Sequence, residues 1–329
     1  MDLRQTLYDT AARQGLGASA TRQLEAWAGL QTPPAATARR AAQGLAVAAA
    51  ALLGLGLVFW VAAHWDTLGR FGRLALLQAA VVVLGLGAWW RPAARLPLSL
   101  ALVLATGALL AYIGQTYQTG ADPWQLFALW ALLVLPLCLG LRSDVLWAPW
   151  ALIAMTAVAL WVQTHTGQRW RAEPHDLAAH LVGWLLALLL MTALSPPLRR
   201  HTGAGPWALR TALVLTVVSV SASALGGLFQ QQVAAHYGAG VLLLVLLAAA
   251  HLPRGTFDVF GLSAAALGLN TLLVAGLGRW LFDSARNSDS ADPIGRLLLL
   301  GVVAALLLAG TVSQILRLAR ERAAAGAAE

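Results

Sequence analysis

Long apolar runs separated by short polar connections fill most of this chain. Ten of these runs approach the roughly 20 residues that a helix needs to cross a bilayer. They lie at about 41–63, 71–90, 96–114, 123–141, 144–163, 177–195, 210–229, 233–252, 256–280 and 294–317. Because a helix satisfies its own backbone hydrogen bonds in lipid, the pattern predicts an all-α, polytopic transmembrane helical bundle of about ten spans.

Composition and charge strengthen this assignment. Of the 329 residues, 59% are hydrophobic and only 11% are charged, whereas about a quarter of the residues in soluble domains are charged. The 22 basic residues are all Arg and give a formal net charge of +8. They stand singly or in pairs between apolar runs instead of forming one basic face, so nucleic-acid binding is not expected.

The arginines also predict an orientation. An even number of spans places both termini on one side of the membrane. With the N-terminus inside, fifteen of the 22 arginines lie on the inner side and seven on the outer side. Positive charge marks the cytoplasmic side of bilayer proteins, so both termini are expected in the cytoplasm.

The first residues form a separate module. Residues 2–31 are typical of two short amphipathic helices, with Gly15 and Gly17 ending the first and Ser19 capping the second. A hairpin of this size buries little by itself, so residues 1–31 are expected to contact the bilayer or a membrane or cytoplasmic protein partner. The expected divisions are a cytoplasmic hairpin and linker (1–40), a bundle (41–317) and a cytoplasmic tail (318–329).

Small side chains four residues apart predict close helix packing. The first span carries Ala46, Ala50 and Gly54 in such a row. The last span carries a similar row, formed by Gly301, Ala305, Ala309 and Ser313. Such rows let helix backbones approach closely in a membrane, so both are expected to be packing seams.

The stretch GQTYQTGADPW, residues 114–124, places amides, hydroxyls and a carboxylate between two apolar runs. Gly120 and Pro123 predict a turn, and Asp122 can cap the next helix. One interpretation is a hairpin that satisfies its own polar groups. The other is an outward-opening pocket for a polar ligand. The hypothesised lining is Gln115, Tyr117, Gln118 and Asp122, with Trp124 or Trp65 as a stacking wall.

Three further positions complete the hypothesised ligand-binding set. His64 and Asp66 flank Trp65 after the first span, a pattern more typical of an interfacial anchor than of a metal site. Asn270 is the clearest amide deep within a span, where it either bonds to a neighbouring helix or touches a substrate. His165, His175, His180 and His236 are scattered over outer connections and span ends, and the sequence does not group them.

No motif for hydrolysis or nucleotide binding accompanies these residues. The chain has no GxSxG elbow, no Walker loop and no GxGxxG sequence that opens a helix after a strand. Its one cysteine, Cys138, lies inside an apolar run. No catalytic residue, metal site or cofactor is therefore predicted, and an enzyme is the less favoured class.

Residues 1–145 resemble a known family. The resemblance is carried by the polar N-terminal hairpin, by GLGLVFWVAAHWDTLGRFGRLALL and by GALLAYIGQTYQTGADPWQLFALWALLVLPLCLGLRSDVL. These stretches resemble the domain of unknown function 2157 family of predicted bacterial membrane proteins, and IGQTYQTGADPWQLF is the most specific part. The resemblance implies a multi-pass protein of the bacterial inner membrane, with 41–145 as the family-like part of the bundle and 146–317 as the remaining spans. It assigns no activity.

The first functional interpretation is a transporter, or a related membrane protein that binds a small polar or lipid-like ligand from the periplasmic side. The alternative is a noncatalytic scaffold or regulatory subunit of an envelope assembly, and an intramembrane enzyme comes third. A solvent-reachable cavity running from residues 114–124 towards Asn270 favours transport. A fully packed bundle with an exposed apolar groove favours the scaffold.

Overall fold

The computed structural model describes residues 3–29, 35–64, 69–117, 120, 122–167, 172–253, 255–283 and 293–328. Every regular element in these ranges is a helix. The first half contains α1 (Leu3–Arg13), α2 (Ala18–Trp27), α3 (Ala35–Ala63), α4 (Gly69–Trp90), η1 (Pro92–Ala94), α5 (Arg95–Tyr117), α6 (Pro123–Leu141) and α7 (Asp144–Thr166). The second half contains η2 (Pro174–Asp176), α8 (Leu177–Ala193), η3 (Pro196–Leu198), α9 (Arg199–Thr202), α10 (Pro206–Leu228), α11 (Ala235–Ala250), α12 (Val259–Asp283) and α13 (Pro293–Ala328).

The helical class predicted from the sequence is confirmed, and the number of spans is close to the prediction. Eight helices in the described ranges are long and apolar enough to cross a membrane, namely α4, α5, α6, α7, α8, α10, α12 and α13. The other two expected segments fall on α3 and α11. These contribute shorter apolar stretches, Gly44–Gly56 and Ala235–Ala250.

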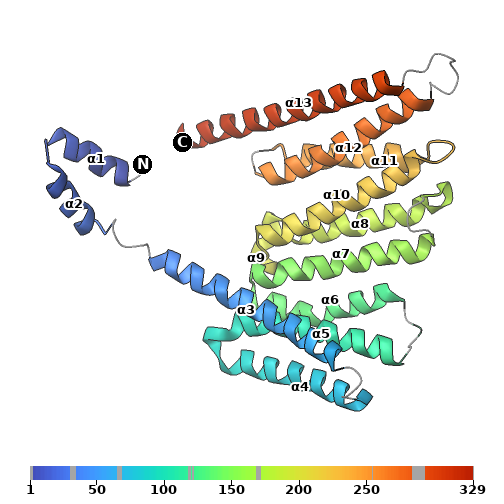
Figure 1. Cartoon of the computed structure of the whole chain (residues 1–329), viewed down its shortest axis with the longest axis horizontal. Helices are drawn as coiled ribbons and strands as arrows, with labels where there is room; N and C mark the ends of the chain where they lie inside the picture. The colour runs from blue at the N-terminus through green and yellow to red at the C-terminus, as the bar shows by residue number, and fades with distance from the viewer. Residues whose placement is uncertain are drawn as a thin grey trace.

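The long helices lie side by side in a row from α4 to α13 (Figure 1). In the interior of the row, α7 packs against α6, α8 and α10, and α10 packs in turn against α11 and α12. Fully buried side chains such as Leu146, Leu213, Val220 and Leu272 fill this centre. The end of the bundle where α5, α7, α10 and α12 finish is called the distal end below, and the opposite end, where α13 finishes, the terminal end.

The two rows of small residues have different surroundings. Gly54 lies so close to α5 that a Cβ atom built on it would be 2.6 Å from a Leu104 methyl carbon. Ala50 in the same row is buried, so the predicted seam of the first span is confirmed. Along α13, by contrast, Gly301, Ala305, Ala309 and Ser313 are all exposed. The second row therefore faces away from the bundle, because α13 turns its other side towards α12.

One carboxylate joins the two central helices at the terminal end. Asp144, the first residue of α7, accepts hydrogen bonds at 3.0, 2.7 and 3.0 Å from the backbone N–H groups of Gly205, Trp207 and Ala208. These groups open α10 and have no partner within their own helix. Asp144 thus caps a helix that begins about 60 residues later in the sequence, which fixes α7 against α10.

The N-terminal pair, α1 and α2, is drawn to one side of the bundle in Figure 1. The turn between the two helices contains Gly15, whose φ of +63° suits glycine. The Tyr8 hydroxyl donates a hydrogen bond to the Glu25 carboxylate across the pair. The predicted cap was wrong by two residues, because the N-cap of α2 is Gly17 and Ser19 already lies inside the helix.

Candidate functional site

The polar stretch 114–124 lies at the distal end, where α5 gives way to α6. Gln115 and Tyr117 on the last turn of α5 are exposed, and Gln118 lies outside the described residues. Asp122 occupies the N-cap position of α6 without a side-chain cap hydrogen bond, so its predicted capping role is not realised. Trp124 is half-buried, and its indole nitrogen has no hydrogen-bond partner among the described residues. The pocket hypothesis for this stretch stays a prediction.

His64 follows the last residue of α3 and is held by its own helix. Its ring stacks on Trp60 with 4.5 Å between ring centroids, and its Nδ1 lies 3.0 Å from the Trp60 carbonyl oxygen. Trp65 and Asp66 lie outside the described residues. Stacking on an aromatic side chain at a helix end fits the interfacial-anchor interpretation of this position.

Asn270 is buried near the middle of α12 and bonds to the neighbouring helix. Its Nδ2 donates to the Thr311 hydroxyl of α13 over 2.9 Å. The structure does not bring Asn270 together with the 114–124 stretch, because α5 and α6 pack with α3, α4 and α7 while α12 packs with α10, α11 and α13. Instead, Asn270 lines a cavity of its own.

This cavity, called the groove below, is an open hollow lined by residues of α10, α12 and α13, with a volume of about 1190 Å³. Its walls are mainly apolar. They are formed by Leu225, Phe229, Val274, Ala275, Gly278, Phe282, Leu300, Ala304 and Leu308. Its polar lining residues form two sets: Asn270 and Thr271 lie near the middle of α12, and Gln230, Gln231, Arg279 and Asp283 lie at the distal end. The first set is called the inner end of the groove below and the second its mouth. A concave apolar site with few polar groups is the usual form of a small-molecule site.

Arg279 organises the mouth of the groove. Its guanidinium donates to the Asp283 carboxylate over 3.1 Å and to the backbone carbonyls of Gln230 and Gln231 over 2.7 and 3.0 Å. One side chain of α12 thereby fixes the connection between α10 and α11. Arg296, near the start of α13, donates to the Leu281 carbonyl of α12 over 2.7 Å and so holds α13 against α12.

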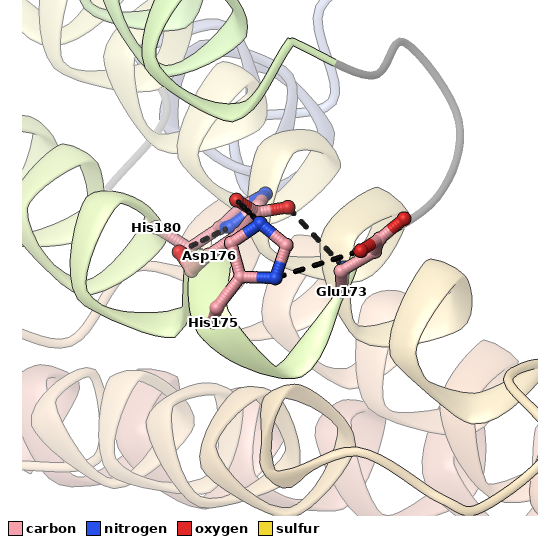
Figure 2. Close-up of polar contacts among 4 residues, drawn as sticks. All are labelled: Glu173, His175, Asp176 and His180. Atoms are coloured by element: carbon pink, nitrogen blue, oxygen red, sulfur yellow. Dashed lines mark hydrogen bonds and ion pairs between the residues drawn. The ribbon is translucent and has the colours of Figure 1, made fainter.

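A second polar group lies at the distal end, where η2 leads into α8 (Figure 2). The His175 ring lies between two carboxylates, 3.5 Å from Glu173 and 3.3 Å from Asp176. His180 Nδ1 is 3.1 Å from the Asp176 carbonyl oxygen. The Asp176 side chain is buried, whereas that of His175 is 74% exposed. Within the described ranges, no three His, Cys, Asp or Glu side chains are grouped so that they could hold a metal ion.

His236, on the first turn of α11, extends this group into the bundle. Its side chain is fully buried, and its ring meets the His180 ring edge-on with 4.9 Å between centroids. Gly227 of α10 packs against its Cβ atom. The fold thus gathers three of the histidines that are scattered in the sequence.

Comparison with known proteins finds a family match for the first part of the chain. Residues 11–147 match a family model described as "Predicted membrane protein (DUF2157)". The resemblance seen in the sequence is therefore confirmed. No curated protein and no solved structure matches the chain. The DUF2157 match ends within the first turns of α7, so it includes the 114–124 stretch, whereas the groove and the histidine group lie beyond it.

Sequence reasoning found Asn270 but not the residues around it. At the mouth, Gln230 and Gln231 lie in the connection between α10 and α11, and Arg279 and Asp283 lie on the last turns of α12, positions where polar side chains are ordinary. The spacing of Arg279 and Asp283, one helical turn apart, predicts their ion pair. Nothing in the sequence pairs Arg279 with the carbonyls of Gln230 and Gln231, because that contact depends on how α10 packs beside α12.

Proposed function

We propose that the protein binds one amphiphilic, lipid-like molecule in the groove between α10, α12 and α13. The observation that supports this most is the distribution of polarity, with apolar walls leading inward from a polar mouth. An acyl or similar chain would replace lipid or water along these walls at little cost. Its polar head would meet the hydrogen-bonding groups at the mouth.

The depth of the groove supports a ligand about one leaflet long. Asn270 at the inner end and Asp283 at the mouth are 13 residues apart on α12, or about 20 Å at 1.5 Å per residue. Half of a bilayer's hydrocarbon core is about 15 Å thick. A molecule that reached from the mouth to Asn270 would therefore extend from the membrane surface to near the bilayer centre.

The mouth favours a neutral or zwitterionic hydrogen-bonding head over a simple anion. Among the described residues, Arg279 is the only basic side chain that lines the groove, and it already donates to a carboxylate and two carbonyls. Asp283 balances its charge. The side-chain amides of Gln230 and Gln231 add donors and acceptors without net charge.

We place the mouth on the periplasmic side, in an inner-membrane protein with both termini in the cytoplasm, on the strength of the arginine distribution. We propose binding in preference to transport because the groove does not cross the bundle. None of the described residues that line it lies at the terminal end. The ligand would enter from the outer leaflet and remain there.

Photo-crosslinking tests this proposal with two neighbouring positions on α13. Ala304 lines the groove, whereas Ala305 is exposed on another side of the helix. The protein in lipid nanodiscs is irradiated with palmitic acid carrying a diazirine, and labelled residues are mapped by mass spectrometry. Labelling is expected at Val274 and Leu300. The Ala304→Trp substitution should reduce it about tenfold or more, equivalent to about 1.4 kcal/mol of binding, and Ala305→Trp should leave it unchanged.

A second filling variant, Ala275→Phe, narrows the groove from α12 and should give the same loss. Thermal unfolding of each variant establishes that the bundle is intact. Equal labelling of Val274 in the Ala304→Trp and Ala305→Trp proteins would overturn the proposal, because it would mean that the probe reaches α12 from bulk lipid.

A further inference from the structure

His236 is a buried ionisable side chain that the proposed function does not use. Its side chain is fully buried, and neither ring nitrogen has a hydrogen-bond partner of acceptable geometry among the described residues. A neutral imidazole has one N–H donor and one acceptor nitrogen. Leaving both unpaired in the interior is costly, so an arrangement of this kind calls for a compensating role.

The groups around His236 have opposing effects on the protonation of its ring. Burial of the imidazole opposes the charge, and so does the neighbouring His180 ring. The Asp176 carboxylate and the Asp176 backbone carbonyl favour it. That carbonyl also lies 3.1 Å from His180 Nδ1, so the two imidazoles share the same negative environment.

We propose that His180 and His236 together form a binding site for a single proton at the distal end of the bundle, with the Asp176 carboxylate as counter-ion. One proton suffices to balance the buried carboxylate. A second would place two like charges on rings whose centroids are 4.9 Å apart, which is unfavourable. The pair therefore takes up a proton as a unit.

The charged groups on η2, α10 and α12 have other partners. Behind Asp176, His175 and Glu173 form the outer part of the group. On α10, the one charged residue is Arg210, which lies near the terminal end and pairs with Asp258. On α12, Arg279 and Asp283 bond to each other. Tyr237 on α11 turns to α12, where its hydroxyl donates to the Leu272 carbonyl.

The proton has a route from solvent through the outer part of the group. His175 is largely exposed and contacts the buried Asp176 carboxylate at 3.3 Å. A proton from water can therefore pass through His175 to the Asp176 carboxylate, whose charge acts on His236. Water is the donor, and no other reactant is needed. The site does not depend on whether the groove holds a ligand.

Histidine NMR of the full-length protein tests the proposal. The chain contains 7 histidines, so selective ¹⁵N and ¹³C labelling yields a small set of side-chain signals. His180→Gln and His236→Gln assign the two signals of interest, and exposed His165 is the internal control. Spectra are recorded from about pH 4.5 to 8.5, a range that covers the usual titration of histidine.

The His180 and His236 signals should change together in one step. Asp176→Asn should move the shared step to lower pH by about one unit, because the counter-ion is lost. His180→Gln should move the His236 step to higher pH, because a neighbouring imidazole is removed. The proposal is overturned if His236 stays neutral over the whole range. It is also overturned if the His236 step occurs at the same pH in the Asp176→Asn and His180→Gln proteins.

Discussion

At the scale of single residues, the polar side chains that matter most are those that bind backbone groups of a different helix. Asp144 and Asp122 show why the sequence does not distinguish them. Asp122 precedes α6 and Asp144 is the first residue of α7, so the position of each suits a helix cap. Only Asp144 reaches backbone donors, and those belong to α10, whereas Asp122 makes no side-chain cap bond. Position along the chain predicts a local cap but not a cap on a distant helix.

This difference predicts unequal effects of the same substitution. Asp144→Ala should lower the free energy of unfolding by about 1–2 kcal/mol, the usual loss when a helix cap is removed. Asp122→Ala should change it little. Denaturant unfolding of the purified protein in detergent, followed by circular dichroism, measures both. Equal losses in the two variants would contradict the assigned role of Asp144.

At the scale of helices, the positions were predicted well and the packing faces poorly. Apolar run length locates a membrane helix because lipid requires it. Which face meets a neighbour is not encoded in the same way, since a helix surrounded by lipid and protein is apolar on all sides. The rows on α3 and α13 illustrate this: both have the same spacing of small residues, yet only the α3 row packs against a neighbouring helix.

Close helix contacts give a prediction at this scale. A Cβ atom on Gly107 of α5 would lie 2.3 Å from the ring of Trp130 on α6, whose indole nitrogen donates to the Val103 carbonyl over 2.9 Å. Gly107→Ala should therefore destabilise the bundle by about 1–3 kcal/mol, as overpacking does. On α4, the nearest atom to a Cβ on Gly85 is 3.9 Å away, on Leu102, so Gly85→Ala should preserve stability. Thermal unfolding compares the two, and a Gly107→Ala protein as stable as Gly85→Ala would disprove this contact.

At the scale of the whole molecule, the order of helices in the row decides where a site can form. The transport interpretation of the sequence joined Asn270 to the 114–124 stretch through one cavity. In the fold, α7 and α10 stand between the helices that carry them. The groove and the contact between His180 and His236 both arise from helices that become neighbours only on folding, so neither has a signature in the linear sequence.

The groove can take a molecule from the outer leaflet only if its mouth and the chain termini lie on opposite sides of the membrane. Gln232 next to the mouth and Ala324 near the end of α13 are both exposed, and the single native cysteine, Cys138, is buried. Gln232→Cys and Ala324→Cys are placed separately in a Cys138→Ser background. Each is treated with a maleimide that does not cross membranes. The Gln232→Cys protein should react in spheroplasts and the Ala324→Cys protein only in inside-out vesicles. Reaction of both from the same side, or of the Gln232→Cys protein only in inside-out vesicles, would contradict an outward-facing groove.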